Sequence, residues 1–230
     1  MTPRSRLIVA LDVASPVDAG KLVSALRGRV GMFKVGGQLF TAAGPDFVRE
    51  LVDGGEKVFL DLKYHDIPNT VANAVAMAAQ LGVSLLDVHA LGGKAMLEAA
   101  AGALPAMATR LLAITVLTGH DEGWLSEIGI SGTLPASVRR LALLAQAAGL
   151  DGVVASPHEV ALIREACGKD FVIVTPGIRP TGSARGDQAR TATPKAALAA
   201  GADYLVVGRP ILEAPDPAAA AEAIVAEMES

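Results

Sequence analysis

The sequence is poor in cysteine and contains no dense cluster of positive charge. Cys167 is the single cysteine, so no disulfide can form within the chain, and residues 1–4 do not resemble the start of a secretion signal. These features predict a cytoplasmic protein. Lysine and arginine number 20 against 24 aspartate and glutamate residues, so a nucleic-acid partner is not expected.

Aromatic residues are also scarce, at 3% of the chain, whereas apolar residues make up 51%. The core must therefore be built mainly from aliphatic side chains, which is typical of parallel strands buried on both faces. Residues 67–86 carry no charge, but Pro68, Asn69, Gln80 and Gly82 interrupt them. We interpret this segment as a helix followed by a strand, and no membrane span is expected.

Short β-branched runs alternate with alanine-rich helical stretches along the chain. The predicted strands span residues 7–12, 32–35, 57–63, 85–89, 111–117, 152–155, 171–175 and 204–207. The predicted helices span residues 16–26, 45–53, 70–81, 94–103, 136–148, 157–166, 194–199 and 217–228. This alternation and the length of 230 residues favour an α/β fold, a single (β/α)8 TIM barrel over residues 1–230. An open, doubly wound sheet is the alternative.

Polar residues stand at or near the ends of the predicted strands. They are Asp12, Lys34, Asp61, Lys63, His89, Thr118, Gly208 and Arg209. Barrel enzymes assemble their active sites at the C-terminal strand ends, so these positions predict a catalytic site. Asp61 and Lys63 are two residues apart and should project to one side, with Asp66 just beyond the strand. A structural network of salt bridges would explain these charges equally well.

The segment at residues 60–70, Leu-Asp-Leu-Lys-Tyr-His-Asp-Ile-Pro-Asn-Thr, resembles the DxKxxDIPxT signature of the orotidine 5′-phosphate decarboxylase family. Further matches follow the family's order at residues 10–12, 33–36, 117–118, 175–179 and 206–211. Six ordered matches at predicted strand ends make coincidence remote. The resemblance implies conversion of orotidine 5′-phosphate to uridine 5′-phosphate and CO2, the last step of de novo UMP synthesis, with no metal or organic cofactor.

The resemblance also implies roles for individual residues around the pyrimidine and the ribose. Lys63 would donate a proton to the carbon that loses its carboxylate and would stabilise the developing negative charge. Asp61 would lie near the substrate carboxylate and position Lys63, and Lys34 would balance the aspartates. Lys34 and Asp12 would contact the ribose, and Thr118 would contact the pyrimidine.

Other matched positions imply a phosphate site and a shared active site. Gly208 and Arg209 would bind the phosphate, because a backbone N–H beside a guanidinium suits a bidentate phosphate contact. Arg179 and Gln188 would close over the ligand. The resemblance further implies a homodimer in which Asp66, Ile67 and Thr70 act in the neighbouring subunit's site.

Two other interpretations remain open. A sugar-phosphate decarboxylase or aldolase of the same superfamily would share the DxKxxD core and use magnesium, but it is expected to carry an acidic ligand where this chain has Lys34. A non-catalytic, nucleotide-binding barrel would use the same charges structurally. Arg185 and Arg190, which follow the seventh predicted strand, are interpreted as solvated loop charges.

Overall fold

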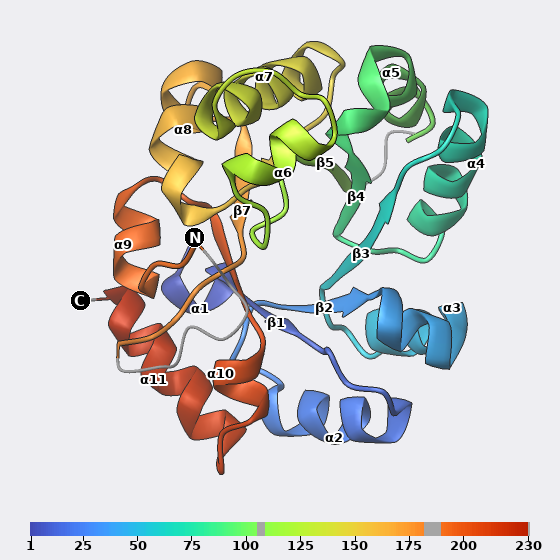
Figure 1. Cartoon of the computed structure of the whole chain (residues 1–230). Coiled ribbons are helices and arrows are strands. Elements are labelled where there is room, and N and C mark those ends of the chain that lie inside the picture. The colour runs from blue at the N-terminus through green and yellow to red at the C-terminus, as the bar shows by residue number, and fades with distance from the viewer. Residues whose placement is uncertain (105–108, 182–189, 230) are drawn as a thin grey trace.

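The computed structural model describes residues 1–104, 109–181 and 190–229, and its strands form a closed parallel barrel (Figure 1). Each strand pairs with the next, and the eighth pairs with the first. The strands are β1 (Leu7–Ala10), β2 (Met32–Gly36), β3 (Val58–Tyr64), β4 (Leu85–His89), β5 (Arg110–Ile114), β6 (Gly152–Val154), β7 (Val172–Thr175) and β8 (Tyr204–Val207). The predicted (β/α)8 barrel is confirmed, and the open sheet is wrong.

Helices surround the barrel on its outside (Figure 1). They are α1 (Pro3–Arg6), α2 (Pro16–Leu26), α3 (Gly37–Asp53), α4 (Pro68–Ala79), α5 (Gly93–Gly102), α6 (Glu122–Glu127), α7 (Leu134–Ala147), α8 (Val160–Cys167), α9 (Pro194–Ala199), α10 (Arg209–Leu212) and α11 (Pro217–Glu229). Two short 3₁₀ helices, η1 (Ala90–Gly92) and η2 (Pro157–Glu159), precede α5 and α8. Several helices begin with proline behind a hydroxyl cap, as when Thr133 accepts the Ala136 N–H at 3.4 Å.

Several elements differ from their predicted bounds, and three of these differences stand out. Helix α3 begins at Gly37 rather than at Pro45, and it is kinked at Gly44, whose φ of 70° only glycine adopts readily. Strand β5 ends at Ile114, three residues before the predicted end, because the chain leaves the barrel wall there toward α6. Helix α6 lies between β5 and α7, where no helix was predicted.

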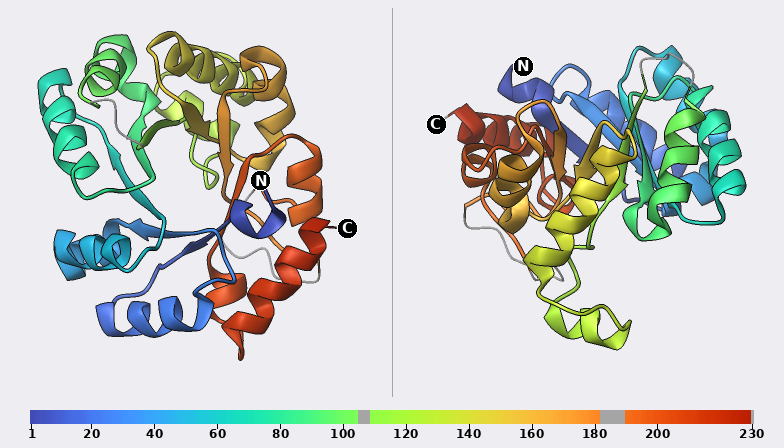
Figure 2. Two further views of the ribbon diagram at one scale, coloured as in Figure 1. Left: turned by 180° about the vertical axis from the view of Figure 1, so that it is seen from behind. Right: turned by 90° about the horizontal axis from the view of Figure 1, so that it is seen from above.

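The two ends of the barrel are built differently. At the N-terminal end of the strands, α1 is tied to the start of β8 by Arg6, whose Nε donates to the Asp203 carbonyl oxygen at 2.9 Å. At the opposite end, α6 projects away from the body of the molecule (Figure 2, right). The long connections that follow β5 and β7 therefore lie at the end where barrel enzymes place their active sites.

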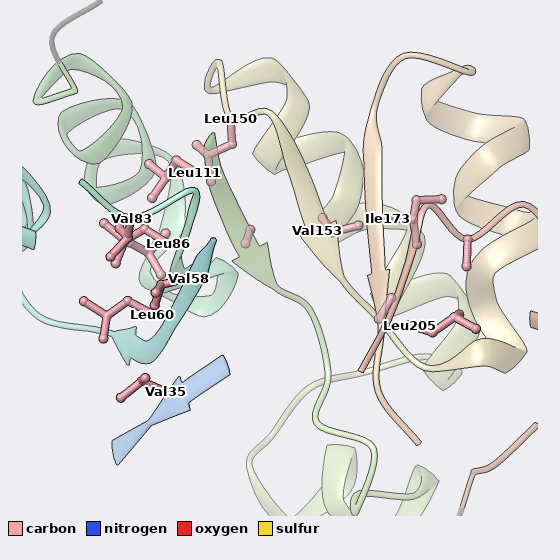
Figure 3. Packing of buried hydrophobic residues seen from close by; sticks show 14 of the residues in the cluster. Val35, Val58, Leu60, Val83, Leu86, Leu111, Leu150, Val153, Ile173 and Leu205 are labelled. Carbon is pink, nitrogen blue, oxygen red and sulfur yellow. The ribbon is translucent and has the colours of Figure 1, made fainter. Parts of the chain in front are cut away.

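The core has two layers because successive strand residues point to opposite faces. The inner layer fills the barrel with Ile8, Ala10, Met32, Phe59, Leu85, Leu112, Val172, Val174 and Val206. The outer layer lies between strands and helices and includes Val35, Leu60 and Leu86 (Figure 3). This alternation places Lys34 after Met32, and Asp61 after Phe59, on the inward face. Within the described ranges, no helix is long and apolar enough to cross a bilayer.

Candidate active site

A cavity of about 440 Å³ opens at the C-terminal ends of the strands. Its volume falls in the range of small-molecule sites. The predicted site residues that line it are Asp12, Lys34, Asp61, Lys63, Thr118, Arg179, Gly208 and Arg209. Apolar strand residues such as Ala10, Ile114 and Val206 form its floor. The structure thus gathers at one cavity side chains from opposite sides of the barrel wall.

Four of these side chains form a row of alternating charge along the cavity. The Nζ of Lys34 lies 3.0 Å from Asp12 Oδ1 and 3.0 Å from Asp61 Oδ2. Asp61 Oδ1 accepts a hydrogen bond from Lys63 Nζ. The side chains of Lys34 and Asp61 are 11% and 10% exposed, while that of Asp12 is 54% exposed. The row therefore runs from a solvated carboxylate into the barrel and back toward the cavity at Lys63.

The buried members of the row stay ionised because each has opposite charges beside it. Burial by itself would raise the pKa of Asp61. The charge of Lys34, the neighbouring Asp87 side chain and the charge of Lys63 outweigh burial and hold that pKa below its usual range. Burial would lower the pKa of Lys34, but Asp61 and Asp12 outweigh it and raise that pKa. The site therefore presents fixed, desolvated charges to a ligand.

The backbone at Lys63 has an unusual conformation. Its φ is 52°, and among the described residues no other residue except glycine has a positive φ. This conformation costs an L-residue about 1–2 kcal/mol. The pairing of β3 with β4 also shifts register between Leu60 and Tyr64. The bulge ends the regular strand and turns Lys63 toward the cavity, as bulges near active sites do.

Asp87 is a site residue that the sequence analysis missed. It lies on the inward face of β4, is 0% exposed, and its Oδ1 accepts the backbone N–H of Lys63 at 2.7 Å. Burial, followed by the neighbouring Asp61 charge, raises the pKa of Asp87 well above its usual value. The signal was present in the sequence as one carboxylate inside an otherwise apolar strand, but only His89 was taken from that strand.

Asp66, Ile67 and Thr70 lie apart from this cavity. All three are exposed, and none is among the residues that line the cavity. Asp66 Oδ1 accepts the N–H of Ile67 at 2.7 Å, at the start of α4. The expected grouping of Asp66 with Asp61 and Lys63 does not occur within one subunit. Its expected role in a partner's site stays a prediction.

The expected phosphate-binding residues lie at the other side of the cavity. Gly208 and Arg209 follow β8 directly, and Arg209 begins α10. Arg179 follows β7, and its backbone N–H donates to the Ala192 carbonyl oxygen at 2.9 Å. Gln188, like Arg185, lies outside the described residues. Three of the four residues predicted to bind phosphate therefore line the cavity, and their role stays a prediction.

The side chain of Arg190 is largely shielded from solvent, so its interpretation as a solvated loop charge is wrong. Its Nη1 lies 2.6 Å from Glu159 Oε1, and the two side chains are only 11% and 5% exposed. Its Nη2 also donates to the Leu117 carbonyl oxygen at 3.0 Å. The sequence placed Arg190 in a polar stretch, but the fold brings its side chain against η2 and the residues that follow β5.

Over the described ranges, no three histidine, cysteine, aspartate or glutamate residues come together in an arrangement able to hold a metal ion. Two of the carboxylates that line the cavity, Asp12 and Asp61, are each paired with the ammonium group of Lys34. The lysine and arginine side chains that line the cavity therefore suit an organic anion as the ligand.

Comparisons with known proteins agree on one family. The model of the "Orotidine 5'-phosphate decarboxylase / HUMPS family" matches residues 5–224. "Orotidine 5'-phosphate decarboxylase" of Halorhodospira halophila is 58% identical over 97% of this chain and 95% of its own length. The protein of the same name from Moorella thermoacetica is 56% identical over 100% and 94%. The crystal structure of orotidine 5′-phosphate decarboxylase from Lactobacillus acidophilus superposes with a TM-score of 0.86 at 42% identity, covering 97% of this chain and 99% of that one.

Proposed function

This chain belongs to the orotidine 5′-phosphate decarboxylase / HUMPS family and is an enzyme, and on that premise we propose that it is a carboxy-lyase that converts orotidine 5′-phosphate to uridine 5′-phosphate and CO2. The observation that carries the proposal is the row of Asp12, Lys34, Asp61 and Lys63 at the mouth of the barrel. This row supplies both an ammonium group and a fixed carboxylate to one reacting carbon.

Lys63 is the proton donor in the proposed reaction. Loss of CO2 leaves an electron pair on the pyrimidine carbon, and an ammonium group stabilises that charge before it transfers a proton. Lys63 lines the cavity, and its side chain is 37% exposed, so a ligand can reach Nζ. Its hydrogen bond to Asp61 directs the ammonium group toward the same region.

Asp61 and Lys34 set the electrostatics of this reaction. A substrate carboxylate beside Lys63 would lie close to the negative charge of Asp61. The role that the contacts of Asp61 support directly is the positioning of Lys63. Lys34 compensates Asp61 on the side away from Lys63, at 3.0 Å. Asp12 and Lys34 would contact the ribose, and Thr118 the pyrimidine, since all of them line the cavity.

The phosphate is proposed to bind between Gly208, Arg209 and Arg179, with Gln188 contributing from outside the described residues. Arginine suits this role because its planar fork pairs two N–H groups with phosphate oxygens. Binding energy from a phosphate far from the reacting carbon can then be used to align that carbon with Lys63.

The decisive experiment is a spectrophotometric turnover assay with purified protein and orotidine 5′-phosphate. We expect turnover without added metal, and Lys63→Ala should lower it by at least about 10²-fold, the usual contribution of a general acid. Lys21→Ala is the matched control, since Lys21 also pairs with an aspartate, Asp18, but on the surface. Unfolding curves would verify that both variants fold. Undiminished turnover in Lys63→Ala would remove that residue from its role.

The absence of a metal requirement is tested in the same assay. We expect EDTA to leave turnover unchanged, because the proposed chemistry draws its positive charge from Lys34 and Lys63. If EDTA abolished activity and magnesium restored it, the metal-dependent branch of the superfamily would be the better assignment.

We further propose that residues 1–230 act as one catalytic domain within a cytoplasmic homodimer, with no nucleic-acid or membrane partner. Asp66, Ile67 and Thr70 would complete the partner subunit's site, which fits their exposure and their distance from the cavity of their own chain. Mixing inactive Asp66→Ala and Lys63→Ala proteins should restore activity, because one of the two sites in a heterodimer then carries neither change. If the subunits exchange and no activity returns, the sites are not shared.

A further inference from the structure

Asp87 is a buried carboxyl group in direct contact with the catalytic row, and the reaction as proposed does not use it. It is 0% exposed, whereas Asp61 is 8% exposed. Its Oδ1 accepts the Lys63 N–H, and its Oδ2 faces no N–H or O–H donor among the described residues. A buried carboxylate oxygen without a donor is costly, so the state of this group calls for an explanation.

The group that Asp87 meets is a second carboxylate. Asp61 and Asp87 directly follow the paired residues Leu60 and Leu86 on neighbouring strands, and both contact Lys63. Two carboxyl groups placed side by side in this way can share a hydrogen bond only when one of them carries a proton. Asp61 cannot be the protonated partner without losing its ion pairs, because its Oδ1 faces Lys63 and its Oδ2 faces Lys34. The proton therefore belongs to Asp87, which forms no ion pair of this kind with any of the described residues.

The position of Asp87 matches the irregularity in β3. Leu60 pairs with Leu86 and Tyr64 pairs with Val88, so residues 61–63 of β3 stand opposite the single residue Asp87. The Lys63 N–H consequently has no backbone acceptor on β4 and donates to the Asp87 side chain instead. This bond holds Lys63 in its positive-φ conformation, which needs such support to persist.

We propose that Asp87 is a positioning residue which, as a neutral carboxylic acid, donates a hydrogen bond to the Asp61 carboxylate while it accepts the Lys63 N–H. It thereby fixes both the carboxylate and the ammonium group that meet the substrate. This inference rests on the proposed function, because it assigns Asp87 a part in aligning Lys63. A neutral acid serves here because an ionised Asp87 would repel Asp61 across a desolvated gap.

Two substitutions separate positioning from simple filling of space. Asp87→Ala removes both hydrogen bonds, and we expect kcat to fall about 10²-fold, the size of the loss that a small misplacement of a catalytic group produces, with KM changed far less. Asp87→Asn retains an acceptor for Lys63 and replaces the acid's O–H by an N–H donor for Asp61, so it should recover most of that loss. A carboxylate required for its charge would instead leave both variants equally impaired, and this result would overturn the proposal.

The proton is observed directly by infrared spectroscopy. At neutral pH the native protein should show the carbonyl stretch of a protonated carboxyl group, and Asp87→Asn should lack it. No such band in the native protein would also overturn the proposal, even if Asp87→Ala did not fold. Lys63→Ala is assayed in parallel: retained turnover in that variant defeats the proposed function, whereas its loss together with full kcat in Asp87→Ala defeats only the role of Asp87.

Discussion

Replacing Arg190 with methionine is expected to destabilise the protein far more than replacing an arginine of a similar surface ion pair. Arg190 and Glu159 are 2.6 Å apart, with side chains 11% and 5% exposed. Arg49 and Asp46 are also 2.6 Å apart, but they are 54% and 84% exposed. The two pairs differ in burial and not in distance, so they isolate the effect of desolvation.

The magnitude follows from what each substitution leaves behind. Without Arg190, the Glu159 carboxylate stays buried with no cation, and its Oε2 already lacks a hydrogen-bond partner among the described residues. Breaking a buried pair in this way costs about 3–5 kcal/mol. Arg49→Met removes a solvated pair, worth about 0–1 kcal/mol. In a chain of this size, the first loss should lower Tm by about 6–20 °C and the second by less than about 4 °C.

Urea unfolding at pH 7 measures both free energies, with circular dichroism as the signal. The double variant Glu159→Gln/Arg190→Met should be more stable than Arg190→Met, because it no longer buries an unpaired charge. Equal losses in Arg190→Met and Arg49→Met would refute the reasoning, since burial would then have no measurable effect on the strength of the pair.

Two further predictions concern the charged groups near the cavity. Lys34→Met should lower the free energy of unfolding by roughly 1–3 kcal/mol and raise the pKa of Asp61, because Asp61 keeps only Lys63 as a cation. Urea midpoints between pH 3 and 7 measure this, and unchanged midpoints would contradict it. Burial, His65, Lys63 and His120 lower the pKa of His89 from 6.5 to about 4. The unfolded chain therefore binds a proton at His89 that the folded protein does not bind between these values, so stability should fall as pH decreases from about 6.5 to 4. His89→Asn should flatten that part of the pH profile, and an unaltered slope would exclude His89 as its source.

Much of the barrel could be predicted because its signals are local. The apolar run Leu-Ile-Val-Ala-Leu ends at the polar residue Asp12 and is soon followed by Ser15 and Pro16, which cap and begin a helix. These local signals specify a strand and a helix start within a few residues. The errors arose where a local signal was ambiguous. Pro45 indicated a helix start, but the helical segment before it depends on Gly44, whose conformation no pattern reveals.

The residues of the site were predictable to the extent that they lie at strand ends. Asp12, Lys34, Asp61 and Lys63 could be proposed as one group because parallel strands bring their C-terminal ends together. Asp87 could not be recognised in the same way, since its importance depends on a bulge in a different strand. Arg190 was misinterpreted because its burial depends on contacts with η2 and with Leu117 beyond β5, which are distant in sequence.

The amino-acid pattern alone was sufficient to predict the alternation of strands and helices. It also predicted opposite charges at the mouth of a barrel, because side-chain direction along a strand has a period of two. The tertiary structure decided which charge each group faces and which of them is desolvated. It paired Lys34 with two aspartates, kept Asp66 out of the cavity, and set Asp87 behind Asp61 and Lys63. Those outcomes depend on register and burial, which arise only when strands far apart in the chain are packed together.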